Sequence, residues 1–366
     1  MYETFRTPYY LQRNIEVKYS SFTAEWQIKG KSSVSYNDVA AYTTYGTSRA
    51  NAYKILEDSL NLRDVSIYDT IEDADGKERR VLNAKETTYN GEKFVGEQIE
   101  SIISQTNKDW HLYIRDDGSK DSTIKVLDEY ASKFPKQISI DISCPSNMGA
   151  GESFMYLLSV VDADYYMFCD QDDIWNNDKV EKTFQRIREI ESVHDETIGI
   201  GVFTDLTLVD SNLNILSASL WKADNRHPEY TKSFYKQWTN RHASYGCTQM
   251  FNKAAKELVL PYRQFKNIMG GHDNWVEYIL IKKGVYEYID EPTILYRQHG
   301  ANVVGANFGH GYRQELKKII HNPSILLKNL RKDYDRMKLM PFHVSLFLVL
   351  WYRFKQSITS FFNING

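Results

Sequence analysis

The sequence has no long apolar run and few cysteines. No stretch reaches the roughly 20 apolar residues that span a bilayer, and the first twenty residues have no apolar core, so we expect neither a secretory signal nor a transmembrane helix. The three cysteines, Cys144, Cys169 and Cys247, are odd in number and far apart. They give neither a metal-binding spacing nor a disulfide framework, and a reducing cytosol fits them best.

The chain also lacks a strong excess of charge of either sign. Its 366 residues carry 45 Lys and Arg against 48 Asp and Glu, a net charge of −3, so there is no chain-wide basic field for nucleic acid. Hydrophobic residues make up 42% and charged residues 25%, which excludes a largely disordered or fibrous chain. At roughly 150 residues per domain, the length predicts about two domains. Aromatic residues are abundant at 14%, which fits a sugar-binding surface or ordinary packing.

From Thr87 to about Asn302, short apolar runs alternate with amphipathic segments. Strands alternating with helices predict a mostly parallel α/β sheet, whose ligands bind beyond the carboxyl ends of the strands. The acidic clusters at 116–117 and 170–173 fall at such ends. The apolar spacing predicts helices at 94–103, 124–131, 154–161 and 176–193, and strands at 112–114, 138–142 and 165–169.

Residues 1–86 follow a different pattern. A helix beginning near Ser35, a turn at 45–47 and a second helix at 49–60 precede two possible strands, 65–70 and 79–83, which would pair across Asp75-Gly76. This order resembles a winged helix-turn-helix domain. The segment holds 12 Lys and Arg against 13 Asp and Glu, whereas a DNA-binding face needs a basic patch. We therefore favour a small accessory or interaction domain over a DNA-binding one.

A series of short motifs runs through the α/β region in a fixed order. The motifs are Thr88-Tyr89-Asn90-Gly91-Glu92, Arg115-Asp116-Asp117-Gly118-Ser119, Asn147-Met148-Gly149, Asp170-Gln171-Asp172-Asp173, Gly246-Cys247-Thr248-Gln249, His272-Asp273-Asn274-Trp275 and Tyr296-Arg297-Gln298-His299-Gly300. With them, residues 87–305 resemble a bacterial family 2 glycosyltransferase of the rhamnosyltransferase-like subgroup. The resemblance implies a GT-A fold, a divalent metal, a nucleotide-sugar donor and inversion at the anomeric carbon.

The aspartates after the 165–169 run are candidate metal ligands. A nucleoside diphosphate leaving group carries concentrated negative charge, which Mg²⁺ or Mn²⁺ neutralises through oxygen ligands. Three aspartates within four residues also repel one another unless a cation is present. The resemblance makes Asp172 the main metal ligand and places Asp170 near the ribose and the metal. Capping of the 176–193 helix is the alternative.

The resemblance also assigns donor contacts. Asp117 would accept hydrogen bonds from a uracil or thymine ring, with Thr88 and Tyr89 beside the base; an Asx-capped turn is the alternative. Arg297 would meet phosphate, and His299 would bind the metal or the diphosphate, unless it is a plain core or surface histidine. Further donor contacts are expected at Asn90, Glu92, Asn147 and Gly149.

Inverting transfer requires a base that takes the proton of the acceptor hydroxyl. Asp273, directly after His272, matches the family's base position; a helix N-cap is the alternative. We expect His272 and Trp275 to contact the acceptor, although Trp275 would serve equally as core packing.

The sequence departs from the family pattern just before the first motif. The family's first strand is apolar, but here Lys85 and Glu86 occupy its end. An unpaired buried charge is expensive. Either the strand is shortened and these side chains reach solvent, or residues 1–86 are foreign to the catalytic domain, which would impair donor binding.

The C-terminal region, 306–366, is expected to be basic and helical. The apolar segment 344–352 lies within residues 311–355, which hold 10 Lys and Arg against 3 Asp and Glu. Cations beside a Trp-bearing apolar helix predict an anchor in the membrane interface. A helix packed on the domain is the alternative.

We therefore predict three parts, 1–86, 87–305 and 306–366, and an inverting glycosyltransferase. It would move a hexose or deoxyhexose from a UDP- or dTDP-sugar to a cell-surface glycan, lipid-linked at the cytoplasmic face of the membrane. Three rivals stay open: an inactive binding protein of the same fold, a DNA-binding regulator built on residues 1–86, and a nucleotidyltransferase.

Overall fold

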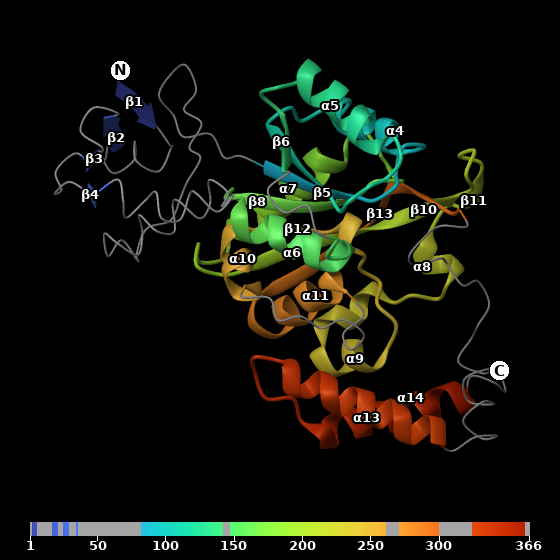
Figure 1. Ribbon diagram of the computed structural model, residues 1–366. Coiled ribbons are helices and arrows are strands. Elements are labelled where there is room, and N and C mark those ends of the chain that lie inside the picture. The colour runs from blue at the N-terminus through green and yellow to red at the C-terminus, as the bar shows by residue number, and fades with distance from the viewer. Residues whose placement is uncertain are drawn as a thin grey trace. The chain divides into compact units, whose positions relative to one another are not determined.

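The computed structural model describes residues 2–5, 17–20, 25–28, 34–35, 82–141, 147–260, 271–299 and 324–362 (Figure 1). The chain forms two compact units, residues 1–81 and 82–366. In the first unit, an antiparallel sheet has the order β1 (Tyr2–Phe5), β2 (Val17–Ser20), β3 (Glu25–Ile28) and β4 (Val34–Ser35). The winged helix-turn-helix pattern falls mostly outside the described residues and stays a prediction.

The second unit is built on a mixed sheet with the order β7-β6-β5-β8-β12-β10-β13-β9, and β11 pairs with β10. Its parallel half contains β5 (Leu82–Thr88), β6 (Trp110–Asp116), β7 (Ile138–Asp141) and β8 (Tyr165–Asp170). The antiparallel strand β12 (Met250–Asn252) joins it to β10 (Ile200–Val209), which runs parallel to β13 (Val285–Arg297). Two short antiparallel strands complete the sheet, β9 (Ile174–Trp175) on β13 and β11 (Ile215–Ser217) on β10.

Helices cover both faces of this sheet (Figure 1). Strand residues alternate between the faces, so Met167 packs with the cluster under α4 (Val95–Ile103), α5 (Thr123–Lys133) and α7 (Lys179–Glu191). Its neighbour Phe168 packs with the cluster under α6 (Ala150–Val160), α10 (Lys253–Val259) and α11 (His272–Lys283). The mostly parallel α/β sheet flanked by helices is confirmed.

The remaining helical segments lie between β10 and β12 and at the C-terminal end. They are α8 (Leu220–Ala223), η1 (Pro228–Lys232), α9 (Phe234–Thr239), η2 (Gly246–Thr248), α13 (Ser324–Leu339) and α14 (Leu346–Phe362). Figure 1 shows α13 and α14 together next to α9. In the described part of the chain, no helix has the length and apolar character needed to cross a bilayer.

Strand β5 is complete and central. All seven residues pair with β6, and Leu82 to Thr87 pair with β8 on the other side. The shortened strand that we considered is therefore wrong, because Lys85 and Glu86 are both fully buried. Leu82 and Asn83, which we assigned to a hairpin of the N-terminal segment, instead begin this strand.

The two buried ionisable residues of β5 lie on opposite faces of the sheet. Lys85 Nζ lies 4.5 Å from the ring centroid of Tyr166 and has no hydrogen-bond partner among the described residues. Burial, and then the charge of Lys256, holds the Lys85 pKa well below its usual value. Burial, followed by Asp170 and Asp172, raises the pKa of Glu86. Both shifts favour the neutral form, which reduces the cost of burial.

Candidate active site

The candidate site forms where the carboxyl ends of three neighbouring strands meet. Thr88 at the end of β5 is in register with Asp116 at the end of β6, and Thr87 is in register with Asp170 at the end of β8. Parallel strands bring their carboxyl ends to one edge of a sheet. The sequence motifs that follow β5, β6 and β8 therefore converge at this edge, as we predicted.

The loop after β5 is tied to the loop after β6. Thr88 Oγ1 donates to Asp116 Oδ1 at 3.0 Å. Asn90 has a φ of 49°, a left-handed conformation that asparagine tolerates better than most residues, and its Oδ1 accepts from the Lys120 amide at 2.9 Å. Glu92 Oε2 accepts from the Ser122 amide at 2.8 Å. The structure therefore places the side chains of Asn90 and Glu92 in loop-to-loop hydrogen bonds, while Tyr89 is 47% exposed.

Asp117 forms hydrogen bonds with other residues that we expect on the donor side. Its Oδ1 accepts from Arg115 Nη1 at 2.6 Å and from the Met148 amide at 2.7 Å, and its Oδ2 accepts from the Gly149 amide at 2.7 Å. Asn147 Nδ2 donates to the Asp117 carbonyl at 2.9 Å. Burial alone would raise the pKa of Asp117, but these bonds lower it below its usual value. These bonds fix the orientation of the Asp117 carboxylate.

The acidic loop after β8 meets the end of β13. His299 Nε2 lies 2.7 Å from Asp172 Oδ2, and both side chains are only partly buried. Burial, then repulsion from Asp172 and from Asp273, raises the pKa of Asp170 to about 7. The structure thus pairs two predicted metal ligands, Asp172 and His299, and it brings Asp172 and the predicted base Asp273 close enough to the third predicted ligand, Asp170, to raise its pKa.

Asp170 also belongs to a group of polar side chains that includes Asp173 and Cys247. Ligand atoms of Asp170, Asp173 and Cys247 lie within 4.8 Å of one another. Asp173 and Cys247 are fully buried, and in the described part of the chain Asp173 Oδ2 has no hydrogen-bond partner. Burial, followed by neighbouring aspartates, raises the pKa of the Asp173 carboxyl and of the Cys247 thiol. The protonated forms of Asp173 and Cys247 are therefore favoured.

The chemistry of Asp170, Asp172 and His299 suits a hard divalent cation. Two carboxylates and one imidazole nitrogen are donor groups that bind Mg²⁺ or Mn²⁺. Burial is the main cause of the raised Asp170 pKa, and repulsion from Asp172 and Asp273, which a cation would relieve, adds to it. Sequence reasoning missed Asp173 and Cys247, although both stand inside the quoted motifs, because nothing in the sequence brings residues so distant together.

Gln171 connects the two halves of the site. Its Oε1 accepts from the Tyr89 amide at 2.8 Å, and its Nε2 donates to the Tyr89 carbonyl at 3.2 Å. A Cβ at Gly91 would come within 2.3 Å of Gln171 Oε1, so glycine is needed for this close approach. The side chain therefore holds the loop after β5 against the loop that carries Asp170 and Asp172. Sequence reasoning missed this residue as well.

Arg297 does not lie where we expected it. Only 2% of the residue is exposed, and the guanidinium lies 4.4 Å from the Phe94 ring centroid. Its Nε donates to the Asp172 carbonyl at 2.9 Å, and its Nη2 donates to Glu97 Oε2 at 2.5 Å. The structure uses Arg297 to hold the backbone of Asp172, so the phosphate contact that we predicted is replaced by protein contacts.

The start of α11 carries the residues predicted for the acceptor side. The His272 ring packs on both Phe154 and Phe168, with ring centroids at 4.4 and 4.6 Å, and burial lowers its pKa. Asp273 lies in the first turn, where its carbonyl accepts from Gln249 Nε2 at 3.2 Å. Trp275 is 2% exposed and donates from Nε1 to the Val259 carbonyl at 2.8 Å. The structure therefore places Trp275 in the core, the alternative that we weighed, rather than on an open wall.

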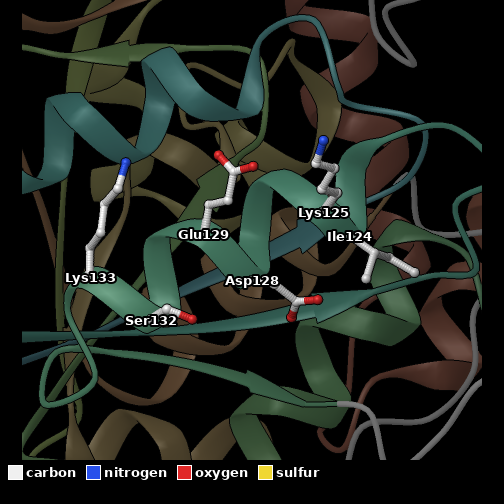
Figure 2. Close-up of a pocket in the computed structure, with 6 residues that line it drawn as sticks. All are labelled: Ile124, Lys125, Asp128, Glu129, Ser132 and Lys133. Carbon is white, nitrogen blue, oxygen red and sulfur yellow. The ribbon is translucent and has the colours of Figure 1, made fainter.

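Figure 2 shows a shallow hollow on the outer face of α5. Its lining side chains all come from this one helix and include none of the residues discussed above: Ile124, Lys125, Asp128, Glu129, Ser132 and Lys133. Because, among the described residues, reactive side chains from other helices or strands do not line this hollow, we assign it no role.

Comparison with known proteins identifies the family. The model for glycosyl transferase family 2 matches residues 87–259, and a domain of unknown function (DUF8437) matches residues 1–134, a range that crosses residue 86. The dTDP-rhamnosyl transferase RfbG of Shigella flexneri is 31% identical over 248 residues, which cover 64% of this chain and 78% of RfbG. The chain belongs to glycosyltransferase family 2.

Two solved structures are similar to this glycosyltransferase. Staphylococcus aureus TarS 1–349 in complex with UDP is 17% identical with a TM-score of 0.44, covering 59% of this chain and 60% of that one. The mannosyltransferase PcManGT of Pyrobaculum calidifontis, in complex with GDP-Man and Mn²⁺, is 13% identical with a TM-score of 0.45, covering 72% and 69%. Family membership and the sheet order of the second unit together give the GT-A fold, which confirms the fold prediction.

Proposed function

We propose that this glycosyltransferase moves a hexose or deoxyhexose, with inversion, from a UDP- or dTDP-sugar to a cell-surface polysaccharide acceptor carried on a lipid. The observation that carries the proposal is the meeting of Asp170, Asp172, His299 and Asp273 at the carboxyl edge of the sheet. The RfbG relative, named as a dTDP-rhamnosyl transferase, supports a deoxyhexose donor.

The donor's nucleoside would lie over the loops after β5 and β6. Tyr89 is exposed enough to stack on a base, and Asp117 would accept a hydrogen bond from the ring N–H of uracil or thymine. Because Arg115 and two backbone amides fix the Asp117 carboxylate, its orientation is set before the donor arrives. Gln171 holds Tyr89 at a fixed position relative to the acidic loop.

Asp170, Asp172 and His299 would hold the divalent cation, Mg²⁺ or Mn²⁺. When bound, such a cation neutralises the diphosphate and acts as a Lewis acid for its departure. Arg297 contributes indirectly, because it fixes the Asp172 backbone from beneath. His299 adds a nitrogen donor from a different strand, which ties the end of β13 to the loop after β8.

Asp273 would act as the base. Its carboxylate takes the proton of the acceptor hydroxyl as that oxygen forms its bond to the anomeric carbon. The bond from this carbon to the diphosphate oxygen breaks on the opposite face, and the leaving group departs with the electron pair. His272, packed on two phenylalanines and favoured in its neutral form, would border the acceptor hydroxyl.

We place this reaction at the cytoplasmic surface of the membrane, where lipid-linked acceptors are found. The basic C-terminal region supports the placement, since cations favour anionic headgroups and a lipid diphosphate.

A nucleotide-sugar panel tests the proposal. The full chain is incubated with Mn²⁺ and each donor, and the released nucleotide is identified. The proposal expects nucleoside diphosphate from one UDP- or dTDP-sugar, with the signal lost in Asp172→Asn. Pyrophosphate release would instead identify a nucleotidyltransferase, and no turnover despite donor-induced thermal stabilisation would identify an inactive binding protein.

A further inference from the structure

One face of α14 exposes an unusual row of large apolar side chains. Phe347 is 73% exposed and Phe354 57%, and Leu346, Leu350 and Trp351 are each more than 40% exposed. The positions recur at spacings of three and four residues, so they share one side of the helix. We call these five residues the α14 ridge. Surface apolar residues are ordinarily scattered singly, whereas a contiguous row indicates an interaction site.

The opposite side of α14 is fixed to the domain. Val349 is fully buried, and the Tyr352 ring stacks on Tyr235 with centroids 6.1 Å apart. The Ser345 amide, just before the helix, donates to the Tyr235 hydroxyl at 3.0 Å. Arg353 Nε donates to Asp333 Oδ2 of α13 at 2.8 Å. The orientation of α14 is therefore set by the fold, and the ridge faces outward.

Basic side chains are frequent in the segment that contains the ridge. Residues 324–355 contain seven Lys and Arg against two Asp. Asp333 is buried and pairs with Arg336 and Arg353, so it adds no exposed negative charge. The exposed cations of this segment include Arg331, Lys332, Lys338 and Lys355, the last with Nζ 5.9 Å from the Trp351 ring.

We propose that the α14 ridge inserts into the interface of an anionic phospholipid bilayer, with α14 lying in the membrane plane. Trp and Phe beside Lys and Arg form the pattern of interfacial helices, which combine apolar insertion with attraction to anionic lipid. A second copy of this chain is a poorer occupant, because two basic faces repel each other. The inference deepens the membrane placement in the proposed function and does not depend on catalysis.

The attachment of α14 extends to the helix that carries Asp273. Asp333 also contacts Arg336, which donates to the Tyr278 hydroxyl of α11 and lies with its guanidinium 4.5 Å from the Trp238 ring centroid. The Tyr278 hydroxyl in turn lies 3.1 Å from His242 Nε2. A bilayer that holds α14 would therefore also hold α11 at a fixed orientation, which suits an acceptor presented from the lipid surface.

Vesicle co-sedimentation of the full chain tests the ridge. We expect binding to phosphatidylcholine vesicles containing phosphatidylglycerol, weaker binding to phosphatidylcholine alone, and release by salt. Phe347→Ser with Phe354→Ser should weaken binding roughly 100-fold, from the apolar area lost. Val193→Ser with Ile215→Ser is the matched control, since these side chains are 75% and 68% exposed elsewhere, and it should bind like the wild type.

Brominated lipids provide a second readout. They should quench the fluorescence of the wild type, and the quenching should fall in Trp351→Phe. Equal binding by the ridge variant and the wild type, or no binding by either, would overturn the proposal. If the ridge variant instead turns a sedimenting dimer into a monomer, a second copy is the occupant and the proposal is wrong. Donor hydrolysis measured without vesicles tests the proposed enzymatic function separately, because that reaction does not require membrane binding.

Discussion

His299 Nε2 lies 2.7 Å from Asp172 Oδ2, although the two residues are 127 positions apart in the chain. The contact joins the end of β13 to the acidic loop after β8. It makes His299 part of the proposed cation site, together with Asp170.

The first prediction concerns this contact. His299→Ala removes one proposed cation ligand, so we expect the Kd for Mn²⁺ to rise about tenfold or more, which corresponds to the loss of about 1.4 kcal/mol. A Mn²⁺ titration, monitored by electron paramagnetic resonance, measures this Kd. His194→Ala, at an exposed position, is the control and should leave the Kd unchanged. Unchanged Mn²⁺ binding in His299→Ala would remove His299 from the site.

The second prediction concerns Gln171 and Gly91. Gly91→Ala brings a Cβ within 2.3 Å of Gln171 Oε1, so we expect the Gln171 side chain to move away, its hydrogen bonds to Tyr89 to weaken and the donor KM to rise. Gln171→Ala removes both hydrogen bonds to Tyr89 and should also raise the donor KM. In the double variant the clash is gone, so its KM should match that of Gln171→Ala alone. Strictly additive effects would show that the two residues do not interact.

The third prediction concerns Arg297. If its guanidinium holds the Asp172 backbone, Arg297→Gln should destabilise the protein without any donor, by about 2 kcal/mol for lost buried hydrogen bonds. Thermal unfolding in the absence of nucleotide measures this loss. If Arg297→Gln instead has wild-type stability and a raised KM for the donor, the result would support the phosphate contact that the sequence predicted.

The fourth prediction concerns the buried Lys85. Its pKa lies well below 10.5 in the folded state, so between the folded pKa and pH 10.5 the unfolded chain binds a proton that the folded protein does not. Stability therefore rises with pH through this window, and the lysine costs most at low pH. Lys85→Met should raise the Tm more at pH 6 than at pH 9, by the equivalent of about 1.4 kcal/mol for each pH unit of the window between these two values. The exposed Lys125→Met is the control and should show no pH-dependent gain.

The fifth prediction concerns the start of the catalytic unit. Because β5 begins at Leu82, a chain of residues 82–366 keeps the whole central strand, whereas 87–366 retains only its last two residues. We expect the longer chain to fold and the shorter one to lose its structure, as read by far-UV circular dichroism and limited proteolysis. A folded 87–366 chain would instead support the hypothesis that everything before Thr87 is foreign to the catalytic domain.

The helices and strands around the site followed from local patterns. The apolar run at 165–169 predicted β8, and the spacing of Val95, Ile99 and Ile102 predicted α4, because buried strands and amphipathic helices leave periodic signals in the sequence. The convergence of the motifs at one edge followed from the parallel sheet.

The sequence could not place individual side chains. An arginine after an apolar strand can bind either a phosphate or the protein itself, and the sequence pattern does not distinguish the two. The contacts of Arg297 with Phe94 and Glu97 show that it binds the protein. The core position of Trp275 is likewise visible only from its hydrogen bond to the Val259 carbonyl. The sequence correctly indicated that burying Lys85 and Glu86 costs free energy. It did not show that the strand would bury them nevertheless, because the pKa shifts and the contact of Lys85 with the Tyr166 ring depend on residues distant in the chain.

Nucleoside diphosphate release from a UDP- or dTDP-sugar in the presence of Mn²⁺ tests the central claim most directly. Asp172→Asn should abolish the release, while Asp178→Asn, an aspartate that pairs with Lys182 at the start of α7, should retain it. Wild-type rates in Asp172→Asn would contradict the account, because the acidic loop after β8 would then have no part in the departure of the diphosphate.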